Sequence, residues 1–152
     1  MSRHLFFTGE LNSSNEFPVS QIKIDNSFNF KNLHLVRVVV KGLKISGTAP
    51  DCIPSATHFH LRVSGSGNSQ LGNANFIVRS LDDTLPGWPV PMGNEKFLDV
   101  EYRAPIAIVH SDVPIHTPIL NLSLVNEDGA LLNTTTELTN GATYAVWLIA
   151  SD

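Results

Sequence analysis

TPILNLSLVNEDGALLNTTTELTNGATYAVWLIA, residues 117–150, is the stretch that decides the fold. Leucines and polar residues alternate along residues 119–124, which is the period-2 pattern of a strand with one buried face. Residues 127–129 (Glu-Asp-Gly) then predict a turn, because Asp hydrogen-bonds its own backbone and Gly supplies positive φ. Residues 143–150 are apolar on both faces. An exposed apolar edge invites aggregation, so this last strand is predicted to be central in its sheet.

The connection between these two strands predicts how they are placed. It runs from Ala130 to Asn140, which is long and threonine-rich for a simple hairpin. The two strands are therefore predicted to lie in different sheets of a sandwich. Asn140-Gly141 is a second turn signal, and Trp147 is assigned to the core.

The rest of the chain repeats short strands between loops rich in Gly and Pro. The densest strand signal is Leu33–Ile45, where Val36, Val38 and Val40 are expected on one face and Gly42 at a bulge or bend. Further strands are predicted at residues 3–9, 21–24, 57–64, 75–81, 97–102 and 105–110. Eight to nine strands without a convincing amphipathic helix predict an all-β fold, a single jelly-roll β-sandwich. An immunoglobulin-like sandwich is the alternative, but it is usually shorter and shows Cys and Trp landmarks.

Whole-chain properties narrow the class of protein. The 152 residues predict one domain, residues 1–152, with 42% hydrophobic and 16% charged residues. A net charge of −4 argues against nucleic-acid binding, which favours basic patches. No stretch approaches the ~18 apolar residues of a membrane span, and the first residues lack the features of a signal peptide. A single cysteine excludes an intrachain disulfide framework. Synthesis in a reducing compartment, the cytoplasm, is expected.

His58-Phe59-His60 is the sharpest chemical pattern. Residues i and i+2 of a strand share a face, so both imidazoles could reach one metal ion, as at the start of the cupin metal motif. The later parts of that motif are missing, since Ser64 and Gly65 stand where a Glu would follow. The prediction is therefore no metal and no cofactor. His58 and His60 are retained as metal candidates, with paired surface or interface histidines as the better interpretation.

No catalytic residues are predicted, because no Ser/His/Asp set has a nucleophile-elbow context. Two loops instead supply candidate interface or ligand residues. Loop aromatics flanked by prolines are common interface anchors. The candidates are Trp88, Pro89 and Pro91 in the proline-rich loop 84–94, and Cys52 and Pro54 in the loop 49–55.

The order of these elements resembles the single jelly-roll minor capsid proteins, the penton or vertex proteins, of virophages and Polinton-like double-stranded DNA viruses. The resemblance covers most of the chain. It rests on Phe17-Pro18-Val19 leading through Phe28-Asn29-Phe30 into residues 36–45, on the proline loop 84–91 before Glu101-Tyr102, and on the closing strands 119–132 and 144–149.

The resemblance implies a structural protein that is not an enzyme. It would form a symmetric homo-oligomeric ring, expected to be a pentamer at a capsid vertex, with a major capsid protein as a further partner. It would be located in the virion. Two alternatives remain open from the residues. One is a lectin-like binding module that uses Trp88 or His58 and His60. The other is a cupin-like metalloenzyme.

Overall fold

A computed structural model provides the fold. It describes residues 2–11, 15–25, 27–46, 53–54, 58–66, 70–77 and 95–152. Among these residues no helix is long and apolar enough to cross a membrane. The strands are β1 (Ser2–Glu10), β2 (Ser20–Lys23), β3 (Phe30–Ser46), β4 (Ile53–Pro54), β5 (His58–Ser64), β6 (Gln70–Ile77), β7 (Glu95–Ile115), β8 (Ile119–Asn126) and β9 (Leu138–Ser151).

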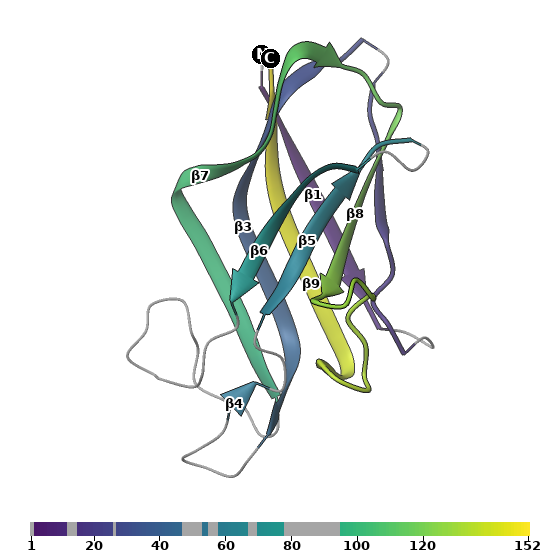
Figure 1. The fold of residues 1–152 in the computed structure, drawn as a ribbon, viewed down its shortest axis with the longest axis vertical. Coiled ribbons are helices and arrows are strands. Elements are labelled where there is room, and N and C mark those ends of the chain that lie inside the picture. The colour runs from purple at the N-terminus through teal and green to yellow at the C-terminus, as the bar shows by residue number, and fades with distance from the viewer. Residues whose placement is uncertain are drawn as a thin grey trace.

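The strands form two sheets that face each other (Figure 1). The five-stranded sheet has the order β1-β9-β3, with β7 also paired to β3 and the two-residue β4 at the end of β3. The four-stranded sheet has the order β2-β8-β5-β6, and every ladder is antiparallel. With β4 set aside, the orders β1-β9-β3-β7 and β2-β8-β5-β6 are those of a jelly roll. The predicted fold class is confirmed.

The chain's last two strands lie where the sequence predicted. β9 is hydrogen-bonded to β1 on one side and to β3 on the other, so it is central, whereas β8 belongs to the opposite sheet. The connection between them is organised by Glu137, which is only 3% exposed. Its carboxylate accepts hydrogen bonds from Asn126 Nδ2 and from the backbone N–H of Asn133, each at 3.0 Å. The buried carboxylate thus ties both ends of the loop together.

The core lies between the sheets because alternate residues of each strand point inward. In β5, Phe59, Leu61 and Val63 are fully buried while the residues between them are partly exposed. Phe28 and Phe30 are both buried, with stacked rings 6.3 Å apart. Burial of this apolar surface is the main stabilising contribution to the fold.

Bulges correct the predicted faces of β3. The ladder register shifts between Leu35 and Arg37, so the inward residues are Leu35, Val38 and Val40. Val36 falls at the shift and does not share the inward face with Val38. The prediction that Val36, Val38 and Val40 lie on one face is therefore wrong for Val36. A second shift between Lys41 and Leu43 contains Gly42 at φ +87°, which confirms the bulge predicted there.

Other strand boundaries also differ from the prediction. Asn140-Gly141 is not a turn between strands but lies within β9, where Gly141 has φ +81°. The segments 97–102 and 105–110 are parts of one long strand, β7, which continues through Pro105. β6 begins at Gln70, earlier than the expected residue 75. The sheet ladders, which are long-range, override these local breaker signals.

Tyr144 gives the fold an expected alkaline sensitivity. Burial raises its pKa from 10.0 to about 12, and its hydroxyl donates to the Pro18 carbonyl at 3.0 Å. Between pH 10 and 12 the unfolded state loses the proton first, so the free energy of unfolding falls as pH rises, by at most ~1.4 kcal/mol per pH unit. Below pH 10 this stabilisation is fully present.

Urea unfolding of wild type and Tyr144→Phe between pH 8 and ~12 checks this expectation. The variant should be about 1 kcal/mol less stable at neutral pH, because it loses the hydrogen bond to Pro18. It should also lose stability less steeply above pH ~10. Burial also raises the pKa of Tyr102, so the difference between the two proteins isolates Tyr144. Equal alkaline slopes would contradict the assignment.

Candidate self-association surface

Trp147 lies on the outer face of the five-stranded sheet, contrary to its predicted place in the core. Alternate residues of β9 point inward and are buried, namely Tyr144, Val146 and Leu148. Because successive residues of a strand point to opposite faces, Trp147 must point outward, and its side chain is half-buried. A large aromatic residue thus stands in the middle of a solvent-facing surface.

Three neighbouring strands build a cluster around this indole. Phe6 of β1 and Arg37 of β3 are both in register with Trp147. The Phe6 ring lies 4.8 Å from the Trp147 ring, centroid to centroid, and is 51% exposed. The Arg37 guanidinium carbon lies 4.9 Å from the centroid of the indole, a cation–π arrangement. We call Phe6, Trp147, Arg37 and Asp99 the aromatic row.

Asp99 of β7 fixes the guanidinium in this position. Arg37 Nε and Nη2 donate to the two carboxylate oxygens of Asp99 at 2.9 and 2.7 Å. This bidentate hydrogen bond raises the pKa of Arg37 above its usual value, with a smaller contribution from the nearby charge. Asp99 therefore has Arg37 as its partner on the outer face of the sheet.

The composition of the aromatic row suits contact with another macromolecule. Trp and Arg are enriched at binding hot spots, and aromatic residues in general at interface cores. Arg37 covers the indole and is itself held by Asp99, so the cluster is ordered before any partner arrives. Preorganisation of this kind lowers the entropic cost of association.

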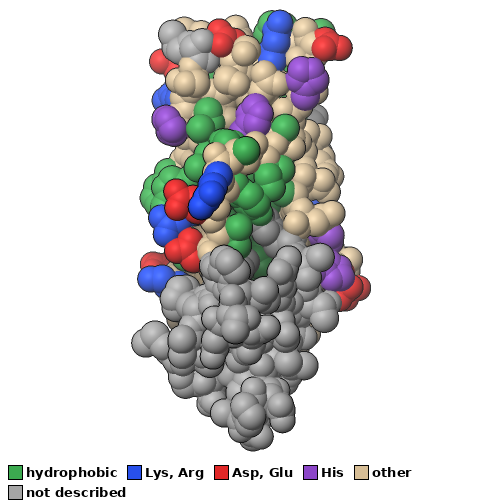
Figure 2. All heavy atoms as spheres, turned by 90° about the vertical axis from the view of Figure 1, so that its left-hand side faces the viewer, with side chains coloured by type: hydrophobic (Ala, Val, Ile, Leu, Met, Phe, Trp, Pro, Cys, Tyr) green, Lys and Arg blue, Asp and Glu red, His purple; other side chains and the backbone are tan. Residues whose placement is uncertain are grey.

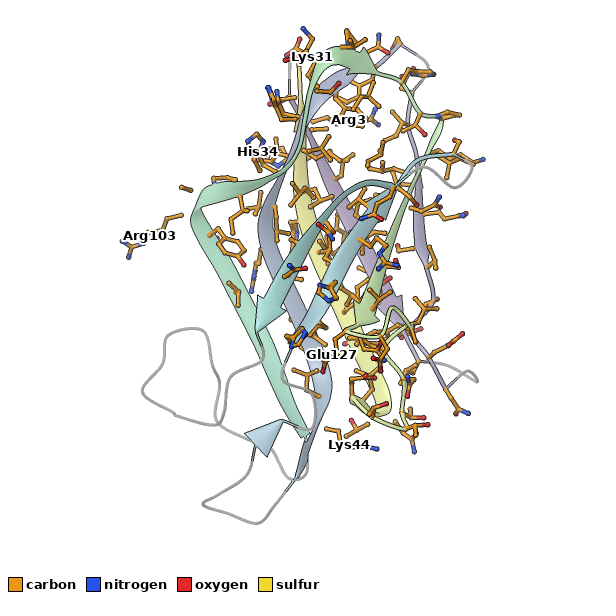
Figure 3. The ribbon with its side chains drawn as sticks, viewed as in Figure 1. Arg3, Lys31, His34, Lys44, Arg103 and Glu127 are labelled. Carbon is orange, nitrogen blue, oxygen red and sulfur yellow. The ribbon has the colours of Figure 1, made fainter. Side chains whose placement is uncertain are left out.

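The histidine pair lies on the opposite sheet. His58 and His60 both face outward from β5, as their spacing predicted, and their rings are 5.7 Å apart. His58 Nε2 lies 3.2 Å from a carboxylate oxygen of Glu127, and His60 Nδ1 is in contact with Asn75 Oδ1. Figure 3 shows Glu127 beside the end of β5, which it reaches from the turn after β8.

These groups do not make a recognisable metal centre. In the part of the chain that the structure describes, no group of three or more His, Cys, Asp or Glu side chains could hold a metal ion. His58 instead has a carboxylate partner, Glu127, which belongs to the turn predicted at residues 127–129. Because Glu127 lies far from His58 in the sequence, only the β5–β8 ladder brings them together.

The loop candidates are largely outside the described residues. Cys52, Trp88, Pro89 and Pro91 fall there, so their proposed roles stay predictions. Pro54 lies in β4, where it is paired with Ile45 of β3.

Exposed apolar side chains lie at two edges of the sandwich, and none of them was predicted from the sequence. Within the described residues, the exposed large hydrophobic side chains are Phe6 (51%), Val19 (47%), Ile106 (41%) and Val113 (69%). Figure 2 shows apolar side chains gathered on the side of the molecule formed by β7. A signal was present at residues 104–109 (APIAIV), which carry no charge although they belong to a strand at a sheet edge.

Comparison with known proteins gives no family. No family model matches the chain, and no curated protein sequence matches it. Among solved structures, a chain of empty-head turnip yellow mosaic virus is similar at TM-score 0.31 and 13% identity, covering 100% of this chain and 81% of that one. A chain of mud crab tombus-like virus is similar at TM-score 0.26 and 10% identity, covering 99% and 88%. Likeness at this level carries no argument about function.

Proposed function

We propose that the chain is a structural protein without enzymatic activity, and that copies of it assemble into a symmetric ring in a virus capsid. The ring is a vertex capsomer, expected to be a pentamer, that contacts a major capsid protein in the virion. The sequence resemblance to single jelly-roll vertex proteins supplies the viral role. The exposed aromatic row supplies the physical basis for assembly.

The aromatic row is the main support for the proposal, because a monomer leaves part of its apolar ring surface in contact with water. Phe6 is 51% exposed, beside an indole that is itself not fully buried. Burying apolar area contributes ~25 cal/mol per Å², so a partner that covers these rings gains binding energy. Arg37 and Asp99 satisfy each other's charges in advance. A partner therefore need not supply a countercharge for either.

A ring requires a heterologous contact whose rotation closes. Such an assembly has a defined mass, unlike an open filament or an aggregate. Sedimentation equilibrium across the micromolar range should therefore show one dominant species above the dimer, at a whole-number multiple of the 16.6 kDa chain mass. Its mass should reach a plateau with concentration. A chain that stays monomeric at high micromolar concentration would contradict the proposal, and unlimited growth would contradict closure.

The viral part has a separate test. The genes beside this one should include those for a major capsid protein and a packaging ATPase. Purified ring should then bind purified major capsid protein in pull-down experiments. If the protein forms a ring but its gene lies among unrelated cellular genes, the proposal of ring assembly stands and the capsid role is overturned.

A further inference from the structure

We infer that the contact between copies joins opposite edges of the sandwich, with the edge formed by β1 and β2 of one copy docked on the β7 edge of the next. This inference rests on the proposed self-assembly and specifies its geometry. β1 and β7 lie at opposite ends of the strand order β1-β9-β3-β7. A ring built through two different, opposed edges is heterologous, as closure requires.

The exposed apolar side chains divide between these two edges. Phe6 projects from β1, and Val19 directly precedes β2, which contacts β1. Ile106 and Val113 project from β7. Each edge therefore offers apolar side chains that the monomer leaves in water, and each could cover those of the other.

The strand ladders place the two sets at the same level. Phe6 is in register with Trp147, Trp147 with Arg37, and Arg37 with Glu101. In the next row toward the chain termini, Leu5 leads in the same way through Leu148 and Leu35 to Ile106. Phe6 is thus level with Glu101 of β7, and Ile106 lies in the row next to it. In a ring whose axis runs along the strands, residues at equal levels meet.

The β7 edge projects at this level. Residues 102–105 lie opposite Val36 alone in the ladder, so β7 leaves β3 there and forms a corner. Pro105 fits this place because it has no N–H for a ladder hydrogen bond. Figure 3 shows Arg103 pointing away from the molecule at this corner, and Figure 2 shows apolar side chains on this side of the molecule. The corner also prevents plain strand-to-strand pairing along the edge.

Charges at the ends of the two edges are complementary. The Asp112 side chain of β7 is 98% exposed, and its ion-pair partner at 3.7 Å is His110, whose side chain is 73% exposed. On β1, the exposed Arg3 lies at the same end of the strands, with its guanidinium over the Phe28 ring at 5.7 Å. Arg3 is also close enough to Asp25 to help lower the pKa of that carboxyl, after the hydrogen bonds from Ser27. Edge-to-edge docking brings Arg3 of one copy toward Asp112 of the next, and opposite charges set register and direction.

A complementation experiment tests the pairing of edges. Phe6→Lys disables the β1 edge and leaves β7 intact, whereas Ile106→Glu does the reverse. Each variant alone should be monomeric, with at least a tenfold loss of association. An equal mixture should form a heterodimer and stop there, because only one functional contact remains. Ala130→Lys and Ala130→Glu place the same charges on an exposed turn away from both edges, and should assemble as wild type does.

Each outcome separates the two proposals. A monomeric wild-type chain overturns self-assembly itself. If the wild-type chain forms a ring and either Phe6→Lys or Ile106→Glu assembles as well as wild type does, the ring proposal stands and the edge pairing is overturned. Assembly of Ile106→Glu alone would instead indicate contact between two β1 edges. If one of these variants has a lower melting temperature than wild type, a second variant replaces it. Val19→Lys then replaces Phe6→Lys, and Val113→Glu replaces Ile106→Glu, since each places the same charge on the same edge at an exposed residue.

Discussion

A chain truncated after Asn140 is expected to lose its fold entirely. The truncation removes most of β9, which is hydrogen-bonded to both β1 and β3. It also removes the buried side chains of Tyr144, Val146 and Leu148. Loss of a single large core side chain costs ~2–5 kcal/mol, and a domain has only ~5–15 kcal/mol of stability in total. Several such losses together exceed the stability of the protein.

Circular dichroism and thermal melting of the truncated chain measure this effect. The spectrum should lack the native β signal, and no cooperative transition should appear. The matched control ends at Ala150 and removes only Ser151 and Asp152, which lie outside the buried core. It should melt within a few degrees of the full chain. A soluble truncation at Asn140 that melts cooperatively would contradict the central position of β9.

The sequence predicted this central position because alternation and composition act together in the tail. A strand that is apolar on both faces must be covered along both its edges, and the long threonine-rich connection indicated a change of sheet. Both expectations depend on properties that are local in sequence. Gly42 belongs to the same class, since a glycine within a strand is itself a signal for a bulge.

For Trp147, the hydrophobicity of the side chain led to the wrong prediction, whereas the alternation of inward and outward residues along the strand would have led to the right one. Its size and hydrophobicity favoured the core, although Tyr144, Val146 and Leu148 already occupied the inward positions around it. The alternation pattern contained the correct answer. A large aromatic residue at an outward position of a central strand is the signal for a contact surface, and it was overlooked.

The partners of Trp147 were not accessible from the sequence. Phe6, Arg37 and Asp99 come from three other strands, and only the registers of the ladders bring them together. The bulge at Val36 likewise could not be predicted from the sequence, because no glycine or proline marks it. The pairing of His58 with Glu127 depends in the same way on the β5–β8 ladder. Long-range register is a property of the whole fold.

Substitution of Gly72 is the second change with a large expected effect. β6 and β7 belong to different sheets and meet at the open side of the sandwich. A Cβ atom at Gly72 would lie 2.2 Å from the Ile108 carbonyl oxygen and 2.8 Å from Val109 Cγ2. The carbonyl belongs to the backbone of β7 and cannot rotate away, so the two strands must separate. Gly72→Ala should therefore destabilise the fold by ~1–3 kcal/mol, and Gly72→Val by more.

Urea unfolding of matched variants separates this clash from other effects. Gly129 has open space around it but φ +87°, so Gly129→Ala carries only backbone strain, ~1–2 kcal/mol. Gly72 is not among the glycines with positive φ, and any loss there comes from the close approach of β7. Asn73→Ala, at the exposed next position, should change the free energy of unfolding by no more than ~0.5 kcal/mol.

Separation of β6 from β7 also displaces the strand that carries Ile106 and Val113. Gly72→Ala should thus weaken assembly as well as stability, whereas Gly129→Ala should lower stability alone. Equal effects of the two on assembly would show that the β7 edge is not part of the contact.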